Sequence, residues 1–98
     1  MTQALTGPEP VRGGVRFTVE AASAKTVSVA GSFNQWSTTS HPLHPSTRHG
    51  LWSGVIPLPP GEHLFMYVVD GTHWVSPPLA EDHVDDGFGA QNGVVVVR

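Results

Sequence analysis

The feature that most constrains the fold of this chain is a period-two alternation of apolar and polar residues in short segments. Val15, Phe17 and Val19 are separated by polar residues, and Val27 and Val29 repeat the pattern further on. Such alternation is typical of a strand that buries one face. No segment keeps a helical period over the ten or more residues that a helix needs. The chain is therefore predicted to be all-β.

Turn signals divide the second half of the sequence into further strands. Pro59-Pro60-Gly61 marks a turn, because proline fixes φ and glycine accepts positive φ. Asp70-Gly71 is the dipeptide of a tight β-hairpin. The predicted strands in this half are residues 51–58, 62–70, 73–76 and 93–97. About six short strands in one small domain predict an antiparallel β-sandwich.

The chain is expected to form a single domain with a short tail. Residues 1–10 contain glycine and two prolines without periodicity, so they are predicted to be a flexible N-terminal tail. Residues 11–98 are the predicted sandwich domain. Within it, the polar segment 32–50 and the acidic segment 79–89 are predicted to be loops. A catalytic barrel of about 250 residues does not fit in 98 residues.

Composition and charge argue against several classes of partner. The net charge is −3 with five Lys and Arg residues, so there is no basic stripe for nucleic acid. No apolar run approaches the ~20 residues of a membrane span. The N-terminus lacks the basic and apolar segments of a signal peptide, and we expect a cytoplasmic protein. The chain has no cysteine, which excludes disulfides and thiolate metal sites.

Metal binding and catalysis have little support in the sequence. His41, His44 and His49 lie in one segment but lack a second pair at zinc-finger spacing. The acidic run at 81–86 lacks the pattern of a calcium loop and is predicted to be solvated. Glycoside hydrolysis needs two carboxylates facing each other across a cleft, and no Gly-x-Ser-x-Gly motif is present. No metal, no other cofactor and no catalytic residue is therefore predicted.

The three tryptophans fall into two kinds of position. Trp52 lies among apolar residues of a predicted strand and is interpreted as a core residue. Trp36 follows the end of a strand in a polar loop, and Trp74 follows a two-residue turn on a very short strand. The alternative for Trp74 is that it packs as a lid over the sandwich. Exposed indoles at a rim would offer a surface to a ligand.

A sugar is the ligand that suits two rim tryptophans. A pyranose ring has an apolar face of C–H groups, which an indole covers, and a fringe of hydroxyls, which amides bind. Two separated indoles would contact glucose units along one curved chain. The amides expected near them are Asn34, Gln35, Gln91 and Asn92.

Four blocks of this sequence resemble one known family. They are Gly-Ser-Phe-Asn-Gln-Trp at 31–36, Pro-Pro-Gly-Glu-His at 59–63, Val-Asp-Gly at 69–71 before Trp74, and Asn92 before the last strand. In this order they are similar to the family-48 carbohydrate-binding modules, over residues 11–98. That family includes the glycogen-binding domain of the AMP-activated protein kinase β subunit and the N-terminal early-set domains of isoamylase and branching enzymes.

The resemblance implies an immunoglobulin-like, early-set β-sandwich that binds α-1,4-glucans such as glycogen, starch and maltooligosaccharides without catalysis. Trp36 and Trp74 match the two tryptophans that stack on glucose rings in the family. Asn92 matches the asparagine that hydrogen-bonds sugar hydroxyls.

Further positions depart from the family pattern. Phe88, Gly89 and Ala90 fall where the kinase domains carry leucine, glycine and threonine on a loop that reaches the glucan. Phe88 would supply the apolar contact, whereas Ala90 lacks the hydroxyl of threonine. Met66 stands where many members have a sugar-binding lysine, and methionine offers only apolar contact. Ser76 stands where an aspartate often precedes proline.

These departures leave two alternatives beside glucan binding. The first is a docking or regulatory domain with little sugar affinity of its own, whose partner is a glucan-metabolising enzyme of the glycoside hydrolase family 13 type or a kinase subunit. The second is a small hydrolase, for which the sequence offers no catalytic pair. The sequence favours a non-catalytic module, at most an accessory part of a glycoside hydrolase or branching enzyme.

Overall fold

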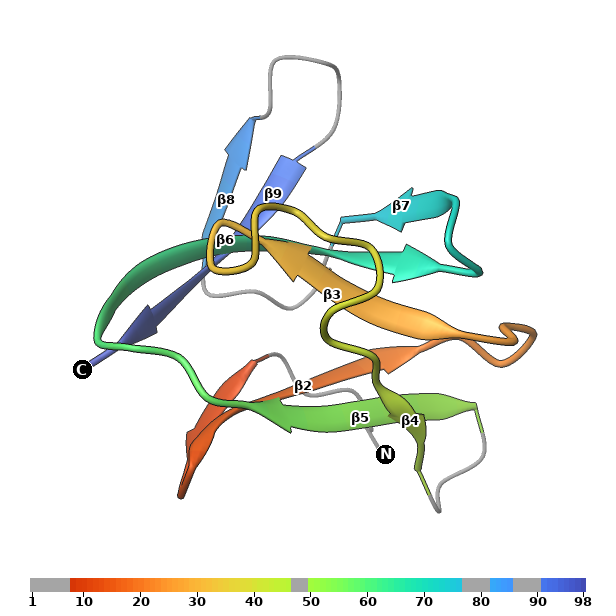
Figure 1. Ribbon diagram of the computed structural model, residues 1–98, viewed down its shortest axis with the longest axis horizontal. Coiled ribbons are helices and arrows are strands. Elements are labelled where there is room, and N and C mark those ends of the chain that lie inside the picture. Colours follow the sequence, from red (N-terminus) through yellow and green to blue (C-terminus); the bar gives the residue numbers. More distant parts are fainter. Residues whose placement is uncertain (1–7, 47–49, 77–81, 86–90) are drawn as a thin grey trace.

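The structure, a computed structural model, describes residues 8–46, 50–76, 82–85 and 91–98 and consists there of strands and turns (Figure 1). No helix in these ranges has the length and apolar content needed to cross a membrane. The strands are β1 (Glu9–Val11), β2 (Gly14–Glu20), β3 (Val27–Gly31), β4 (His44–Pro45), β5 (Leu51–Ile56), β6 (Gly61–Val69), β7 (His73–Val75), β8 (Asp82–Asp85) and β9 (Gln91–Val97).

These strands form two antiparallel sheets. The first sheet has the order β1-β2-β5-β4, and the second has the order β3-β6-β9-β8, with β7 paired to β6. Figure 1 shows the sheets as two layers, with β2 and β5 below β3 and β6. The predicted all-β antiparallel sandwich is confirmed, and its two layers fit the early-set fold that the resemblance implies.

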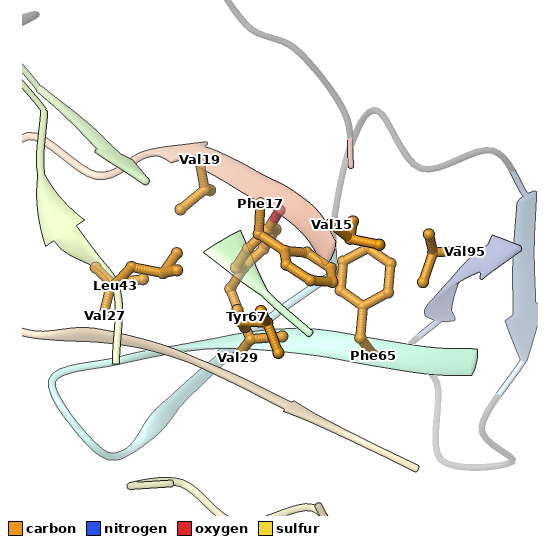
Figure 2. Packing of buried hydrophobic residues seen from close by; sticks show 10 residues of the cluster. Val15, Phe17, Val19, Val27, Val29, Leu43, Phe65, Tyr67 and Val95 are labelled. Atoms are coloured by element: carbon orange, nitrogen blue, oxygen red, sulfur yellow. The ribbon is translucent and has the colours of Figure 1, made fainter. Parts of the chain in front are cut away.

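The period-two alternation places one face of β2 in the core. Val15, Phe17 and Val19 are buried, and the intervening Arg16 and Glu20 are exposed. The opposing sheet supplies its own inward-facing side chains, so the two layers enclose one apolar cluster (Figure 2). This cluster comprises Val15, Phe17, Val19, Val27, Val29, Leu43, Ile56, Phe65, Tyr67 and Val95.

Aromatic rings fill the centre of this cluster. The rings of Phe17 and Phe65 lie edge to face across the two sheets, with centroids 4.9 Å apart. Tyr67 packs edge to face on Phe65 at 5.7 Å, and its hydroxyl donates to the carbonyl oxygen of Thr18 at 3.3 Å. Burial raises the pKa of the Tyr67 hydroxyl. The phenol therefore stays neutral and joins the sheets by one hydrogen bond.

The second sheet is buried on both faces. Phe65 and Tyr67 point into the core, and the alternating Met66 and Val68 on the outer face are also buried. All five residues of β3 are buried as well. This agrees with the sequence, in which β6 carries apolar residues at successive positions instead of alternating ones. The outer face of this sheet is thus apolar at its centre.

The predicted loop at 32–50 is wrong for residues 41–45. His44 and Pro45 form β4, which pairs with β5. The N–H of Val29 donates to the carbonyl oxygen of His41 (3.0 Å), and the N–H of Leu43 donates to that of Val27 (2.7 Å). The prolines in this segment suggested a loop, but a proline is tolerated where a strand lies at the edge of a sheet. Leu43 consequently joins the core.

Two other boundaries differ from the predicted ones. Asp82–Asp85 forms β8, which pairs with β9, so the predicted loop at 79–89 is wrong for these residues. At the other end, Glu9 and Pro10 of the expected tail lie in β1, where Glu9 forms an ion pair with Arg16 at 3.3 Å. Residues 1–7 lie outside the described part of the chain. In both cases the pairing depends on a strand elsewhere in the sequence.

The Asp70-Gly71 turn between β6 and β7 is the tight hairpin that the sequence predicts. Asp70 and Gly71 have φ values of 54° and 76°, the left-handed conformation that their dipeptide favours, and Thr72 completes a three-residue loop between the paired Val69 and His73. The Asp70 carboxylate also accepts hydrogen bonds from the backbone N–H groups of Lys25 (2.7 Å) and Thr26 (3.1 Å). These two donors hold the pKa of Asp70 below its usual value, and the charge of Lys25 adds to the effect. The hairpin is thereby tied to the start of β3.

We expect Phe17→Ala to lower the free energy of unfolding by about 3–5 kcal/mol, because the ring is fully buried against Phe65. Urea denaturation followed by circular dichroism measures this loss. Val55→Ala, on the exposed side of the neighbouring strand, is the control and should change stability by no more than about 0.5 kcal/mol. Equal losses for both variants would contradict the core described above.

We expect the carboxylate of Asp70 to stabilise the fold at neutral pH and to lose this effect in acid. Its pKa in the folded state lies below the usual 3.8. The stabilisation is therefore complete above that value and disappears as the pH falls through the lowered pKa. Asp70→Asn keeps a residue suited to the turn but removes the charge.

The measurement for Asp70 is the melting temperature of both proteins between pH 7 and pH 2. The original chain should melt higher at neutral pH, and the difference should shrink toward the acid end. A difference that stays constant over the whole range would show that the charge of Asp70 does not contribute.

Candidate functional site

The strand register brings three of the sequence-predicted site residues onto one face. Trp74 on β7 lies directly opposite Val68 on β6, and Met66 lies two residues before Val68 on the same face. The pairing of β6 with β9 brings Asn92 beside Met66, one residue beyond the last paired positions. Met66, Trp74 and Asn92 thus share the outer face of the second sheet, which we call the outer sheet face.

These three side chains differ in what they present to solvent. Trp74 is 45% exposed, and in the described part of the chain its indole N–H has no hydrogen-bond partner. Asn92 is only 9% exposed, and none of the hydrogen bonds among the described residues uses its side-chain amide. Met66 is 4% exposed, so it presents little surface of its own. The outer sheet face therefore offers an indole ring and an amide on an apolar base.

Trp36 lies in the turn that follows β3. The carbonyl oxygen of Gly31, the last residue of β3, accepts hydrogen bonds from the N–H groups of Asn34 (3.1 Å) and Trp36 (2.9 Å). Gln35 and Trp36 both have left-handed backbones, with φ values of 54° and 58°. Position 31 has no room for a side chain, because a Cβ there would meet the Leu64 carbonyl oxygen and the ring of Phe33.

The backbone of Trp36 is therefore fixed beside the end of β3. Gly31 pairs with Phe65, and β7 pairs with the opposite edge of β6, two strands away from β3. Strand spacing and rise place the end of β3 about 10 Å along the strands and about 10 Å across them from Trp74. The Trp36 side chain is partly buried, and no hydrogen bond among the described residues uses its indole N–H.

Trp52 is a different kind of tryptophan. Its indole N–H donates to the carbonyl oxygen of Ala21 at 3.1 Å, and its ring packs against the core from β5. The interpretation of Trp52 as a core residue is confirmed for its packing against the core, but the ring is only partly buried. The hydrogen bond satisfies its polar group within the protein, as is usual for a structural tryptophan.

Asn34 is buried and is not available to a ligand, although the sequence suggested it as one of the amides beside a sugar. Its side chain is 8% exposed and takes part in four hydrogen bonds within the protein. Sequence reasoning missed this structural role. A possible signal is the short side chain of asparagine directly after a strand, where it commonly bonds nearby backbone groups.

The other sequence-based candidates are the segment 88–90 and the histidine cluster. Phe88, Gly89 and Ala90 lie outside the described residues, as does His49 of the histidine cluster. The Nδ1 atom of His41 lies 2.8 Å from Nδ2 of Asn34. Within the described ranges, no group of three or more His, Asp and Glu side chains is arranged to hold a metal ion.

A hollow of about 300 Å³ lies elsewhere on the molecule, between the turn at 21–24 and the β6–β7 hairpin. It is lined by Ala21, Ala22, Ser23, Ala24, Val69, Asp70 and His73. None of the sequence-predicted site residues lines it. The hollow is therefore separate from the outer sheet face.

Comparison with known proteins identifies the family of the chain. Residues 15–98 match the family described as the glycogen recognition site of AMP-activated protein kinase. The chain is also similar to the 1,4-alpha-glucan branching enzyme GlgB of Pseudomonas syringae pv. syringae, with 43% identity over 65 residues, or 65% of this chain. The corresponding enzyme of Bacillus cytotoxicus is 40% identical over 57 residues, or 58% of this chain.

A third relative, the GlgB branching enzyme of Pseudomonas fluorescens, is 41% identical over 71 residues, or 69% of this chain. In all three comparisons the matched region is only 9% of the length of the relative. The family match, by contrast, spans nearly all of the sandwich, from β2 through β9. The chain therefore belongs to this family of glycogen-recognising carbohydrate-binding modules.

Proposed function

We propose that the protein binds α-1,4-glucans such as glycogen, starch and maltooligosaccharides on the outer sheet face, by stacking glucose rings on Trp36 and Trp74. The observation that carries this proposal is the exposed Trp74 on the same face as Asn92 and Met66, with Trp36 held at the end of the adjacent β3. Binding is non-catalytic, and the cytoplasm is its predicted location.

The chemistry of the face suits a sugar. An indole covers the C–H face of a pyranose, and releasing water from both apolar surfaces favours the contact. Trp74 is 45% exposed, so its indole N–H can bond hydroxyls at the edge of the sugar. Asn92 lies on the same face but is only 9% exposed, so its amide would take the smaller share of these bonds. A separation of about 14 Å between the end of β3, where the Trp36 turn begins, and Trp74, from the strand spacing, suits several glucose units of one bent chain.

The remaining predicted residues would complete the site. Phe88, with Gly89 and Ala90 beside it, would add an apolar contact from the segment before β9. Met66 would act mainly as a base beneath the sugar, because only 4% of its surface is exposed. Neither contact replaces the polar groups of lysine and threonine that the resemblance implies at positions 66 and 90.

The buried Met66 also favours a second candidate function. A face without those polar contacts would hold sugar weakly, and the domain would then serve to dock a larger protein. The branching enzymes similar to this chain are roughly seven times its length, since the 65 and 57 matched residues make up 9% of each. The docking partner would be a glucan-metabolising enzyme or a kinase subunit.

We expect Trp36→Ala and Trp74→Ala each to weaken binding of maltoheptaose or β-cyclodextrin by about 2 kcal/mol or more, about 30-fold in Kd. Calorimetric titration measures the affinity, with tryptophan fluorescence as a second readout. Trp52→Phe is the matched control, because it removes an indole that bonds Ala21 inside the protein. It should lower stability and leave the Kd unchanged.

The two candidate functions give different results in this titration. Heat and fluorescence changes that saturate and that disappear in the tryptophan variants are expected for glucan binding. No change at millimolar sugar would reject it. Capture of a purified branching enzyme or kinase subunit by a protein that does not bind sugar would instead support docking.

We further expect the protein to release no reducing ends from amylose, because the family it matches recognises glycogen and no catalytic pair was found in the sequence. A reducing-end assay over several hours, with an amylase as positive control, measures this. Release that scales with protein concentration and survives repurification would contradict a non-catalytic role.

A further inference from the structure

We propose that Asn34 is the positioning residue of the binding face: its buried amide holds the turn that presents Trp36, without touching the sugar itself. This inference rests on the proposed glucan binding. It concerns a residue that is 8% exposed and lies two positions before Trp36. Its effect on binding therefore has to pass through the conformation of the turn.

The turn needs such support because its backbone is unfavourable. Gln35 and Trp36 are successive non-glycine residues at φ values of 54° and 58°. Side chains with a Cβ rarely adopt this region, and such residues persist only when the surroundings hold them there. Two backbone hydrogen bonds to the Gly31 carbonyl oxygen close the turn, and the Ser37 N–H donates to the Asn34 carbonyl oxygen at 3.2 Å, but none of these three bonds reaches the segment that returns past β3.

The Asn34 amide supplies the remaining attachments. Its Oδ1 accepts from the backbone N–H groups of Gly31 (3.0 Å) and Ser37 (3.2 Å), which lie on either side of the turn. Its Nδ2 donates to the carbonyl oxygen of Val29 (3.1 Å) and contacts Nδ1 of His41 at 2.8 Å. One side chain thus joins β3, both ends of the turn and the returning segment.

The roles of donor and acceptor follow from this network. Oδ1 faces two N–H donors, so the amide orientation is fixed and Nδ2 must be the donor to His41. His41 Nδ1 is then the acceptor, and its ring proton is on Nε2. The His41 backbone itself pairs with Val29, so the amide is anchored on both sides to β3. No other side chain of this length both donates twice and accepts twice.

Aromatic neighbours help to bury this network. The ring of Phe33 lies edge to face with His41 at 5.7 Å and stacks toward Phe17 of the core at 6.4 Å. Buried hydrogen bonds in such surroundings are costly to break because water does not readily replace them. Loss of the Asn34 amide should therefore free the turn and let Trp36 leave its left-handed conformation.

The first test compares Asn34→Ala with Ile56→Val, a core variant distant from the turn in sequence that also lowers stability. At temperatures where both are folded, Asn34→Ala should raise the Kd for maltoheptaose about tenfold, and Ile56→Val should not. The same Kd in both variants would overturn the proposal. If Asn34→Ala does not fold, His41→Ala is tested in its place, because it removes one of the four bonds of the Asn34 amide. This variant should raise the Kd about threefold. An unchanged Kd would overturn the proposal.

The second test is a double-mutant cycle with Trp36→Ala. A residue that acts only through Trp36 has no further effect once that indole is gone. We therefore expect Asn34→Ala to leave the residual affinity of the Trp36→Ala protein unchanged. A further tenfold loss in that background would mean that Asn34 acts on binding by another route and would overturn the positioning role.

The third test needs no sugar, so it separates this inference from the proposed function. In a chain carrying Trp52→Phe and Trp74→Phe, Trp36 is the single tryptophan, and excitation at 295 nm selects it over Tyr67. Adding Asn34→Ala should increase acrylamide quenching of Trp36 and speed hydrogen exchange at the Gly31 and Ser37 amides. Unchanged quenching and exchange would overturn the inference. If quenching and exchange increase as expected but the protein does not bind sugar, the proposed glucan binding is rejected and the role of Asn34 in holding the turn is kept.

Discussion

The antiparallel pairing along β6 is the interaction on which the rest of the structure depends. On one edge β6 binds β3, and on the other it binds β9 and then β7. Its inward side chains, Phe65 and Tyr67, hold the two sheets together through aromatic contacts with the core. Because successive side chains of a strand alternate, the same pairing fixes Met66 and its neighbours on the outer sheet face. Core and candidate site are thus two faces of one strand.

The two tryptophans of the candidate site are held in place by different kinds of contact. Trp74 stands on a short strand whose hairpin is fixed by the left-handed Asp70-Gly71 turn and by the bonds from Asp70 to the start of β3. Trp36 stands on a turn that is closed by backbone bonds to the Gly31 carbonyl oxygen and is joined to its flanks by the side-chain amide of Asn34. A binding face that holds its groups in advance loses less conformational entropy when a ligand arrives.

Local patterns predicted the strands with strong alternation or clear turn signals, and they failed where the structure of a segment depends on a partner outside the segment. The alternation at β2 predicted both the strand and its buried face, because that signal lies within seven residues. The acidic β8 and the proline-containing β4 have no such signal, and they are strands because β9 and β5 provide partners. The structural role of Asn34 was missed for the same reason: its partner His41 returns from seven residues further along.

The sequence by itself determined the fold class, the hairpin before Trp74 and the separation of Trp52 from the other two tryptophans. These features depend on alternation, on turn dipeptides and on the polarity of near neighbours, all of which are local. Only the tertiary structure decided that Met66, Trp74 and Asn92 share one face and that the Asn34 side chain is buried within the protein. The physical reason is register: the face on which a side chain lies depends on which distant residues its strand pairs with, and a shift of one residue would reverse it.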